Sequence, residues 1–231
     1  MEPLLYSTLI MTGLILLTII PLRAKFNKSQ YQHVSGHNFT KTIFDKGNYG
    51  EFLTFCIFEK MGVNNILTNI YLPQKDGTTT EIDLLVVDTT GIYVFESKNY
   101  SGWIFGDEKN TMWSQSLKGG KKNRFFNPIW QNKGHISALD DYLDKEYTGT
   151  FFSYIIFSER CELKKISCVT STVSVIKRNR LAQEFKNLLC DRPNRLSTEQ
   201  VQKIYSKLKL RTLVDEDTKR IHIKEIKVKH K

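Results

Sequence analysis

The fold is decided by residues 81–98, which read EIDLLVVDTTGIYVFESK. Two β-rich runs, 81–87 and 92–98, flank four residues that end in Gly91. Glycine supplies the positive φ that a tight turn between paired strands needs. The stretch therefore predicts an antiparallel hairpin.

Charged residues collect at the open end of this hairpin. Side chains alternate along a strand, so Glu96 and Lys98 share one face of the second run. A hairpin register can place Asp83, thirteen residues upstream, beside Glu96. Two neighbouring carboxylates repel each other unless a cation such as Mg²⁺ lies between them. The alternative is that Lys98 only neutralises Glu96 at a solvated strand end, and Asp83 favours the cation site over it.

Four sequence blocks around these residues resemble a known family. The spacing of Asp83 and Glu96-Ser97-Lys98 is similar to the core of the PD-(D/E)xK nucleases. The blocks are GE at 50–51, EIDLLVV at 81–87, GIYVFESKNYSG at 91–102 and NPIWQN at 127–132. Together they resemble the nuclease-related domain (NERD) family over about residues 45–160. The resemblance implies an α/β fold of the restriction-endonuclease type, a mixed central sheet flanked by helices, over residues 44–178.

The same resemblance implies a nuclease that uses Mg²⁺, with Mn²⁺ as an alternative. Asp83 and Glu96 would be direct metal ligands, joined by the backbone carbonyl of Ser97. Lys98 would orient or deprotonate the attacking water. The remaining catalytic residues would be Glu51, acting through a metal-bound water, and Gln131, positioning Lys98 or the substrate.

Two helical residues near this site have ordinary explanations as well. Glu51 lies in the first turn of a helix predicted over 46–61, where the helix dipole alone favours a carboxylate. His135 follows Gln131 by four residues, at a position where related nucleases often have tyrosine. We interpret His135 as an exposed residue of the helix that Pro128 begins.

The composition indicates a globular protein with a polyanionic partner. Hydrophobic residues make up 40% of the chain, and the formal net charge is +10. An excess of basic over acidic residues of this size favours nucleic acid or anionic lipid as the partner.

Four cysteines without metal-ligand spacing or a paired motif predict free thiols in a reducing compartment rather than a disulfide framework.

A basic segment, KGGKKNR at 118–124, follows the hairpin. It is either a solvated loop or a mobile loop that tracks a phosphate backbone, with aromatic side chains nearby for stacking. The loop does not distinguish DNA from RNA, and we expect DNA more than RNA as the partner of the whole protein. The binding cations would be Lys118, Lys121, Lys122 and Arg124, and the aromatic side chains Trp113, Phe125 and Phe126.

The N-terminal residues predict a membrane anchor. Residues 3–22 carry no charge, and a helix of that length spans roughly 30 Å of hydrocarbon. A cleaved signal peptide is the alternative, but the n-region carries Glu2. Arg23, Lys25 and Lys28 follow the run, which predicts a single-pass protein with its nuclease-like domain on the cytoplasmic side and the bilayer as a partner. Residues 23–43 would form a tether with some local structure.

Residues 179–231 predict a helical extension and a basic tail. One amphipathic helix is expected over 179–189, and Ser197 should cap another that ends near Leu210. From Lys219 to Lys231, Ile or Val alternates with Lys or His, which fits an exposed edge strand or a disordered tail.

Besides the nuclease, two hypotheses stay open: a catalytically silent nucleic-acid-binding module, and a membrane-bound scaffold of the same fold.

Overall fold

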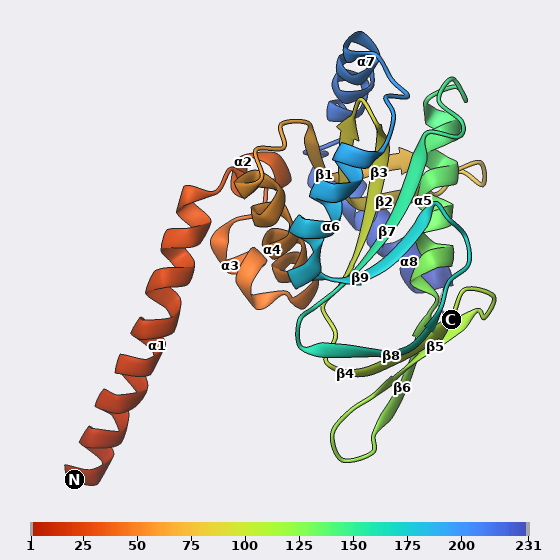
Figure 1. Ribbon diagram of the computed structural model, residues 1–231. Helices are drawn as coiled ribbons and strands as arrows, with labels where there is room; N and C mark the ends of the chain where they lie inside the picture. The colour runs from red at the N-terminus through yellow and green to blue at the C-terminus, as the bar shows by residue number, and fades with distance from the viewer. Residues whose placement is uncertain (1, 230–231) are drawn as a thin grey trace.

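The computed structural model describes residues 2–229, apart from the side chains of residues 2–12, 14–15, 216, 223 and 226–229. Within that range helices flank two sheets, which confirms the predicted α/β class (Figure 1). The helices are α1 Glu2–Lys28, α2 Tyr31–Ser35, α3 Phe39–Phe44, α4 Lys46–Lys60, α5 Pro128–Tyr142, α6 Arg178–Asp191, α7 Thr198–Lys209 and α8 Glu216–Lys229. The strands are β1 Ile66–Pro73, β2 Thr79–Asp88, β3 Gly91–Lys98, β4 Gly102–Asp107, β5 Met112–Ser116, β6 Lys122–Phe126, β7 Phe151–Phe157, β8 Cys161–Ser167 and β9 Val173–Lys177.

The strands described divide into two mixed sheets rather than the single central sheet we predicted. One sheet has the order β1-β2-β3-β7-β9, and the other has the order β6-β5-β4-β8. In each, neighbours in sequence pair antiparallel, while β3–β7, β7–β9 and β4–β8 pair parallel. The strands form two sheets because β4, which follows β3 in the chain, does not pair with β3. It pairs instead with the distant strand β8.

The predicted hairpin is formed by β2 and β3. Their register pairs Leu84 with Phe95 and Val87 with Ile92. Gly91 has a φ of 149°, in the region that glycine adopts without strain. Continued by one residue, the register sets Asp83 across from Glu96, as expected from the sequence.

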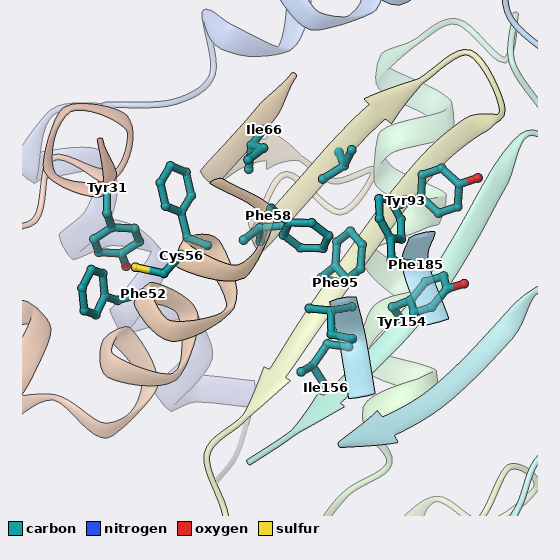
Figure 2. Close-up of a cluster of buried hydrophobic side chains, with 14 of the residues drawn as sticks. Tyr31, Phe52, Cys56, Phe58, Ile66, Tyr93, Phe95, Tyr154, Ile156 and Phe185 are labelled. Atoms are coloured by element: carbon teal, nitrogen blue, oxygen red, sulfur yellow. The ribbon is translucent and has the colours of Figure 1, made fainter. Parts of the chain in front are cut away.

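The five-stranded sheet is covered on both faces, so its central strands carry apolar residues on both faces up to their charged ends. Tyr93 and Phe95 of β3 face α4 and α6, where they contact Phe58 and Phe185 in an aromatic cluster (Figure 2). Residues of opposite parity, such as Val94, face the cluster that α5 and α7 complete. This two-sided burial fixes the end of β3, where the charged residues lie.

The four-stranded sheet packs one face on the end of β7. Trp113 is buried there and stacks on Phe157, with ring centroids 6.1 Å apart. Gly102 begins β4 with a φ of 77°. A Cβ at this position would lie 2.4 Å from the Ser116 carbonyl oxygen, so only glycine allows this approach of β4 to β5.

Gly102→Ala should destabilise the protein more than Gly119→Ala. Both glycines have positive φ, which costs a residue with a Cβ about 1–2 kcal/mol. Gly119 has open space around it, whereas the clash at Gly102 adds overpacking of about 1–3 kcal/mol. Urea unfolding of the two variants measures the difference. Equal losses of unfolding free energy would contradict this packing.

The N-terminal segment requires a correction. Over the described residues, no helix has the length and apolar character needed to cross a membrane. This contradicts the predicted anchor over 3–22, the single-pass topology and the cytoplasmic-side placement, and it leaves the bilayer partner without support. The assumed separation of helix and domain is also absent, because α1 continues through Arg23 to Lys28 and buries Phe26 against Phe39 and Phe52.

The predicted tether, residues 23–43, is largely helical and packed. Helices α2 and α3 lie here, and Tyr31 is fully buried against Phe52 and Phe55 of α4. Gly36 caps the C-terminus of α2 with a φ of 71°. The segment is thus part of the domain core.

The C-terminal helices match the sequence in part. Ser197 and Gln200 form the predicted capping box at the start of α7. Both interpretations of the tail were wrong up to residue 229, because α8 is a helix whose His222 is buried beside Thr79. Residues 230–231 lie outside the described residues.

The four cysteines are free, as predicted, and Cys56 and Cys161 are buried.

Candidate active site

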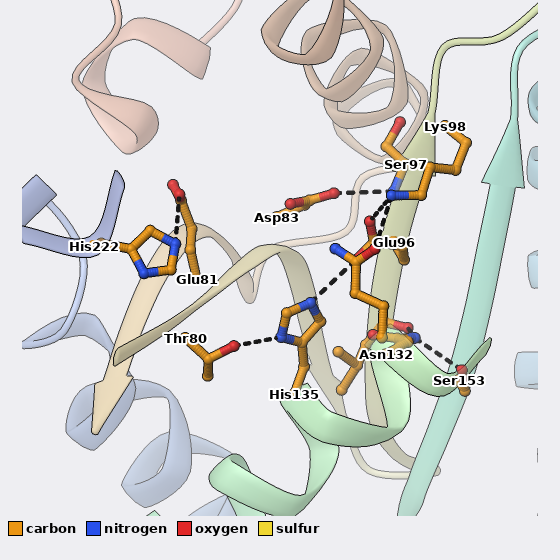
Figure 3. A network of polar contacts seen from close by, with 12 residues as sticks. Thr80, Glu81, Asp83, Glu96, Ser97, Lys98, Asn132, His135, Ser153 and His222 are labelled. Atoms are coloured by element: carbon orange, nitrogen blue, oxygen red, sulfur yellow. Dashed lines mark hydrogen bonds and ion pairs between the residues drawn. The ribbon is translucent and has the colours of Figure 1, made fainter. Parts of the chain in front are cut away.

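Two acidic residues come together where β2 and β3 leave the apolar sheet. The Ser97 backbone N–H donates to Asp83 Oδ2 at 3.0 Å, which holds the Asp83 carboxyl against the end of β3 (Figure 3). Burial, and then the charge of Glu96, raise the pKa of Asp83 well above its usual range. The hairpin therefore brings the charge of Glu96 close enough to oppose the ionisation of Asp83.

Glu96 is buried and held from two sides. Lys98 Nζ donates to its Oε1 at 2.6 Å, and His135 Nε2 lies 3.1 Å from its Oε2. Burial favours the neutral acid, but the Lys98 charge and the His135 hydrogen bond outweigh it and lower the pKa of Glu96 to about 2. Glu96 is therefore a carboxylate across the physiological pH range.

Lys98 bridges the sheet and helix α5. Its Nζ also donates to Gln131 Oε1 at 2.9 Å. Gln131 reaches it because Asn127 caps α5 by accepting the Ile129 N–H, and Pro128 starts the helix in its favoured early position. Burial lowers the pKa of Lys98, but the charges of Glu96 and Asp83 outweigh this and raise it.

Glu51 approaches the same carboxyl groups from the start of α4. A Cβ on Gly50 would lie 3.3 Å from Ser97 Oγ, so the small residue lets the helix end approach β3 closely. Burial raises the pKa of Glu51 well above its usual range, and the charges of Asp83 and Glu96 add to the effect. Its Oε2 lies 3.5 Å from the hydroxyl of Tyr31, which comes from the segment predicted as a tether.

The donor chemistry of this cluster fits a hard divalent cation. Glu96 is already a carboxylate, and a cation bound beside it would also stabilise the charged forms of Asp83 and Glu51, whose pKa values are raised. Ser97 Oγ is a buried oxygen without a hydrogen-bond partner among the described residues, so polar groups here are not fully satisfied. Across the described part of the chain, however, no three His, Cys, Asp or Glu side chains converge as a metal site. Asp83 and Glu96 would thus need backbone oxygen and water to complete a ligand shell.

The basic segment lies apart from this cluster, in the second sheet. It is the turn between β5 and β6 together with the first residues of β6, and its four cations, Lys118, Lys121, Lys122 and Arg124, are exposed. One predicted stacking residue is wrong, since Trp113 is buried. Phe125 packs on Tyr100 with ring centroids 4.8 Å apart, and Phe126 is exposed.

Two residues of the site were missed from the sequence. His135 is buried rather than exposed, and its Nδ1 lies 2.8 Å from Thr80 Oγ1. Asn132 is fully buried and donates to the Val94 carbonyl, which ties α5 to β3. The position of His135, one helical turn after Gln131 on the same face, was a signal that it points toward Lys98 and Glu96.

His135→Leu should destabilise the protein by about 1–3 kcal/mol, the cost of leaving a buried polar group without its partner. The variant leaves Glu96 Oε2 without its hydrogen-bond partner His135. His33→Leu is the matched control, because His33 is exposed on α2. Urea unfolding at neutral pH checks both variants. Equal unfolding free energies for the two would show that the His135 contact carries no stability.

This fold and site place the chain in a family. The nuclease-related domain matches residues 46–158, from α4 through the end of β7. The chain is also 31% identical over 181 residues to an uncharacterized protein of Bacillus anthracis, an alignment that covers 78% of this chain and 82% of that protein. The chain therefore belongs to the nuclease-related domain family. No solved structure matches it.

Proposed function

We propose that this protein is a Mg²⁺-dependent nuclease that hydrolyses phosphodiester bonds, in DNA rather than RNA. The observation that carries the proposal is the convergence of Asp83, Glu96 and Lys98 at the end of one hairpin, where Asp83 accepts the Ser97 N–H, Lys98 donates to Glu96, and the Glu96 charge raises the pKa of Asp83. Membership of the nuclease-related domain family supports the same chemistry. The net charge of +10 is consistent with a polyanionic substrate.

Asp83 and Glu96, with the Ser97 carbonyl, would hold the cation, and Mn²⁺ could replace Mg²⁺. When bound, such an ion supplies positive charge for the developing phosphorane-like transition state and acidifies the attacking water. Glu51, which faces Asp83 from α4, would hold water beside it. This division of roles needs only two carboxylate ligands, as Mg²⁺ retains much of its hydration shell.

Lys98 would orient the attacking water. A lysine ammonium has three donors, and Glu96 and Gln131 accept from it here. The remaining donor can take a water or a phosphate oxygen. Gln131 would act by fixing the direction of that donor, which is a positioning role rather than a chemical one.

The test is cleavage by the full chain of end-labelled DNA and RNA, single- and double-stranded, with Mg²⁺, Mn²⁺ or EDTA. The proposal predicts cleavage with Mg²⁺ or Mn²⁺ that EDTA stops. Asp217→Asn, which changes an 87% exposed carboxylate on α8, should cleave like the wild type. Absence of cleavage of every substrate with either ion would refute the proposal.

A catalytically silent nucleic-acid-binding module is the second candidate. The observation that favours it is the engagement of both Glu96 oxygens by Lys98 and His135, since these donors compete with a cation. On this alternative the protein binds the same oligonucleotides with equal affinity in Mg²⁺ and EDTA and cleaves none.

A further inference from the structure

The four-stranded sheet has an outer face that carries exposed aromatic side chains. On β4, Ile104 is buried, whereas Trp103 and Phe105 point to the other face and are 52% and 36% exposed. Residues on the solvent face of a half-buried sheet are normally polar. Two large aromatic side chains on this face therefore call for a role other than core packing.

Cations continue this face across β5 and β6. Residues paired directly across strands share a face, so each aromatic side chain starts a row. The rows are Trp103, Ser116 and Lys122, and then Phe105, Ser114 and Arg124. On the other side of β4, Lys164 Nζ lies 5.1 Å from the Trp103 ring centroid, and Lys165 pairs with Phe105. We call this set of aromatic and basic side chains the outer face.

Two hollows adjoin the aromatic rings. One, of about 530 Å³, is lined by Trp103 and by Gly102, Gly119 and Gly120, whose lack of side chains leaves room beside the indole. The other, of about 290 Å³, is lined by Phe105 and Lys165 among others. Each hollow thus combines an aromatic ring with space for a flat group, and basic side chains lie beside it.

Two short segments of chain connect the four-stranded sheet to the candidate active site. Only residues 99–101 separate Lys98 at the end of β3 from β4, and a chain of this length spans at most about 14 Å. At one edge of the sheet, β6 leads through Asn127 directly into α5, which carries Gln131. Figure 1 shows this sheet extending below the five-stranded sheet from that junction. A bound polymer could therefore run from the carboxylates onto the outer face.

We infer that the outer face binds an unpaired segment of nucleic acid, with bases stacked on Trp103 and Phe105 and phosphates on Lys122, Arg124 and Lys165. The inference rests on the proposed function and adds that the substrate has a single-stranded segment beside the cleaved bond. Aromatic platforms with nearby cations bind single strands, because every unpaired base has an exposed π-face. In a duplex these faces are covered by neighbouring bases, which leaves the aromatic rings without a partner.

The test measures binding of the full chain to fluorescein-labelled 12-nucleotide oligo(dT), oligo(U) and a 12-base-pair duplex by anisotropy in EDTA. Trp103→Ala and Phe105→Ala should each weaken binding of the single strands about tenfold. Trp103→Phe retains a ring and should bind within about twofold of wild type. Phe44→Ala is the matched control, because Phe44 is 78% exposed on α3 and outside the outer face. It should bind like the wild type.

A second pair of variants tests the proposed binding of phosphates by the cations of the outer face. Arg124→Gln should weaken binding and reduce the salt dependence of affinity by about one released counterion. Lys186→Gln, an exposed cation on α6, should change neither. Unchanged binding in both alanine variants, tighter binding of the duplex than of the single strands, or no oligonucleotide binding at all would overturn the inference.

Failure here is distinguishable from failure of the proposed function, since binding is measured without metal. If Trp103→Ala weakens binding but the wild type cleaves nothing, the outer face stands and the nuclease proposal fails. If the wild type cleaves with Mg²⁺ but Trp103→Ala and Phe105→Ala bind single strands normally, the nuclease stands and the outer face fails.

Discussion

Asp83→Asn should reduce metal-dependent cleavage by at least about 100-fold. Loss of a group that only supports a metal ligand costs about 10–100-fold, and Asp83 is proposed as a direct ligand. The amide keeps the shape of the side chain and can still accept the Ser97 N–H, but it carries no charge for a cation. Single-turnover cleavage of labelled DNA in Mg²⁺ measures the loss. Asp217→Asn removes an equal charge on the surface and should keep wild-type activity.

The same variant should be more stable than wild type when metal is absent. The raised pKa of Asp83 shows that its charge is unfavourable in the folded protein, because burial and Glu96 both oppose it. Thermal unfolding in EDTA should therefore give Asp83→Asn the higher midpoint. Added Mg²⁺ or Mn²⁺ should raise the midpoint of wild type but not of the variant. A metal-induced rise of the same size in both would show that the cation binds elsewhere.

Lys98→Met has the second large effect, on both activity and stability. Loss of the group that orients the water should lower the cleavage rate by about 10²–10⁴-fold. Glu96, which is 2% exposed, then keeps a buried charge without its main partner, at a cost of about 3–5 kcal/mol. Lys186→Met, on the exposed surface of α6, should leave both properties unchanged.

A double variant separates the two effects. Removing both members of a buried pair is far less costly than removing one. Glu96→Gln with Lys98→Met should therefore recover most of the lost stability while remaining inactive. Wild-type cleavage by Lys98→Met, or no recovery of stability in the double variant, would show that the pair does not work in this way.

The pH dependence of stability gives an independent check on the pair. Glu96 has a pKa of about 2 in the folded protein and near 4.3 in the unfolded chain. Its ionised side chain therefore contributes stability that is fully present above about pH 4.3. That contribution is lost as the pH falls from about 4 toward 2. Lys98→Met should remove most of this contribution, so its stability should fall less steeply than that of wild type across this window.

The hairpin and the charged end of β3 could be predicted from the sequence for local reasons. Alternation fixes that Glu96 and Lys98 share a face, and the short turn at Gly91 fixes the register that brings Asp83 opposite. The capping signals at Pro128 and Ser197 also depend on neighbours within one helical turn. These features need no knowledge of distant parts of the chain.

The features that were missed depend on contacts between distant residues. The second sheet exists because β4 pairs with β8, about 60 residues later, which no local pattern reveals. His135 is buried because α5 packs over Glu96, not because of its own helical context. The alternating residues of 219–229 form a helix that docks His222 beside Tyr71 and Thr79, so tertiary packing overrides the period of the sequence.

The measurement that tests the account most directly is a crystal structure of the full chain soaked in Mn²⁺, with anomalous scattering recorded. The account predicts a Mn²⁺ peak that contacts carboxylate oxygens of both Asp83 and Glu96 and the Ser97 carbonyl, with Lys98 still on Gln131. A saturating soak that leaves no peak there, with Lys98 and His135 still on both oxygens of Glu96, would contradict it.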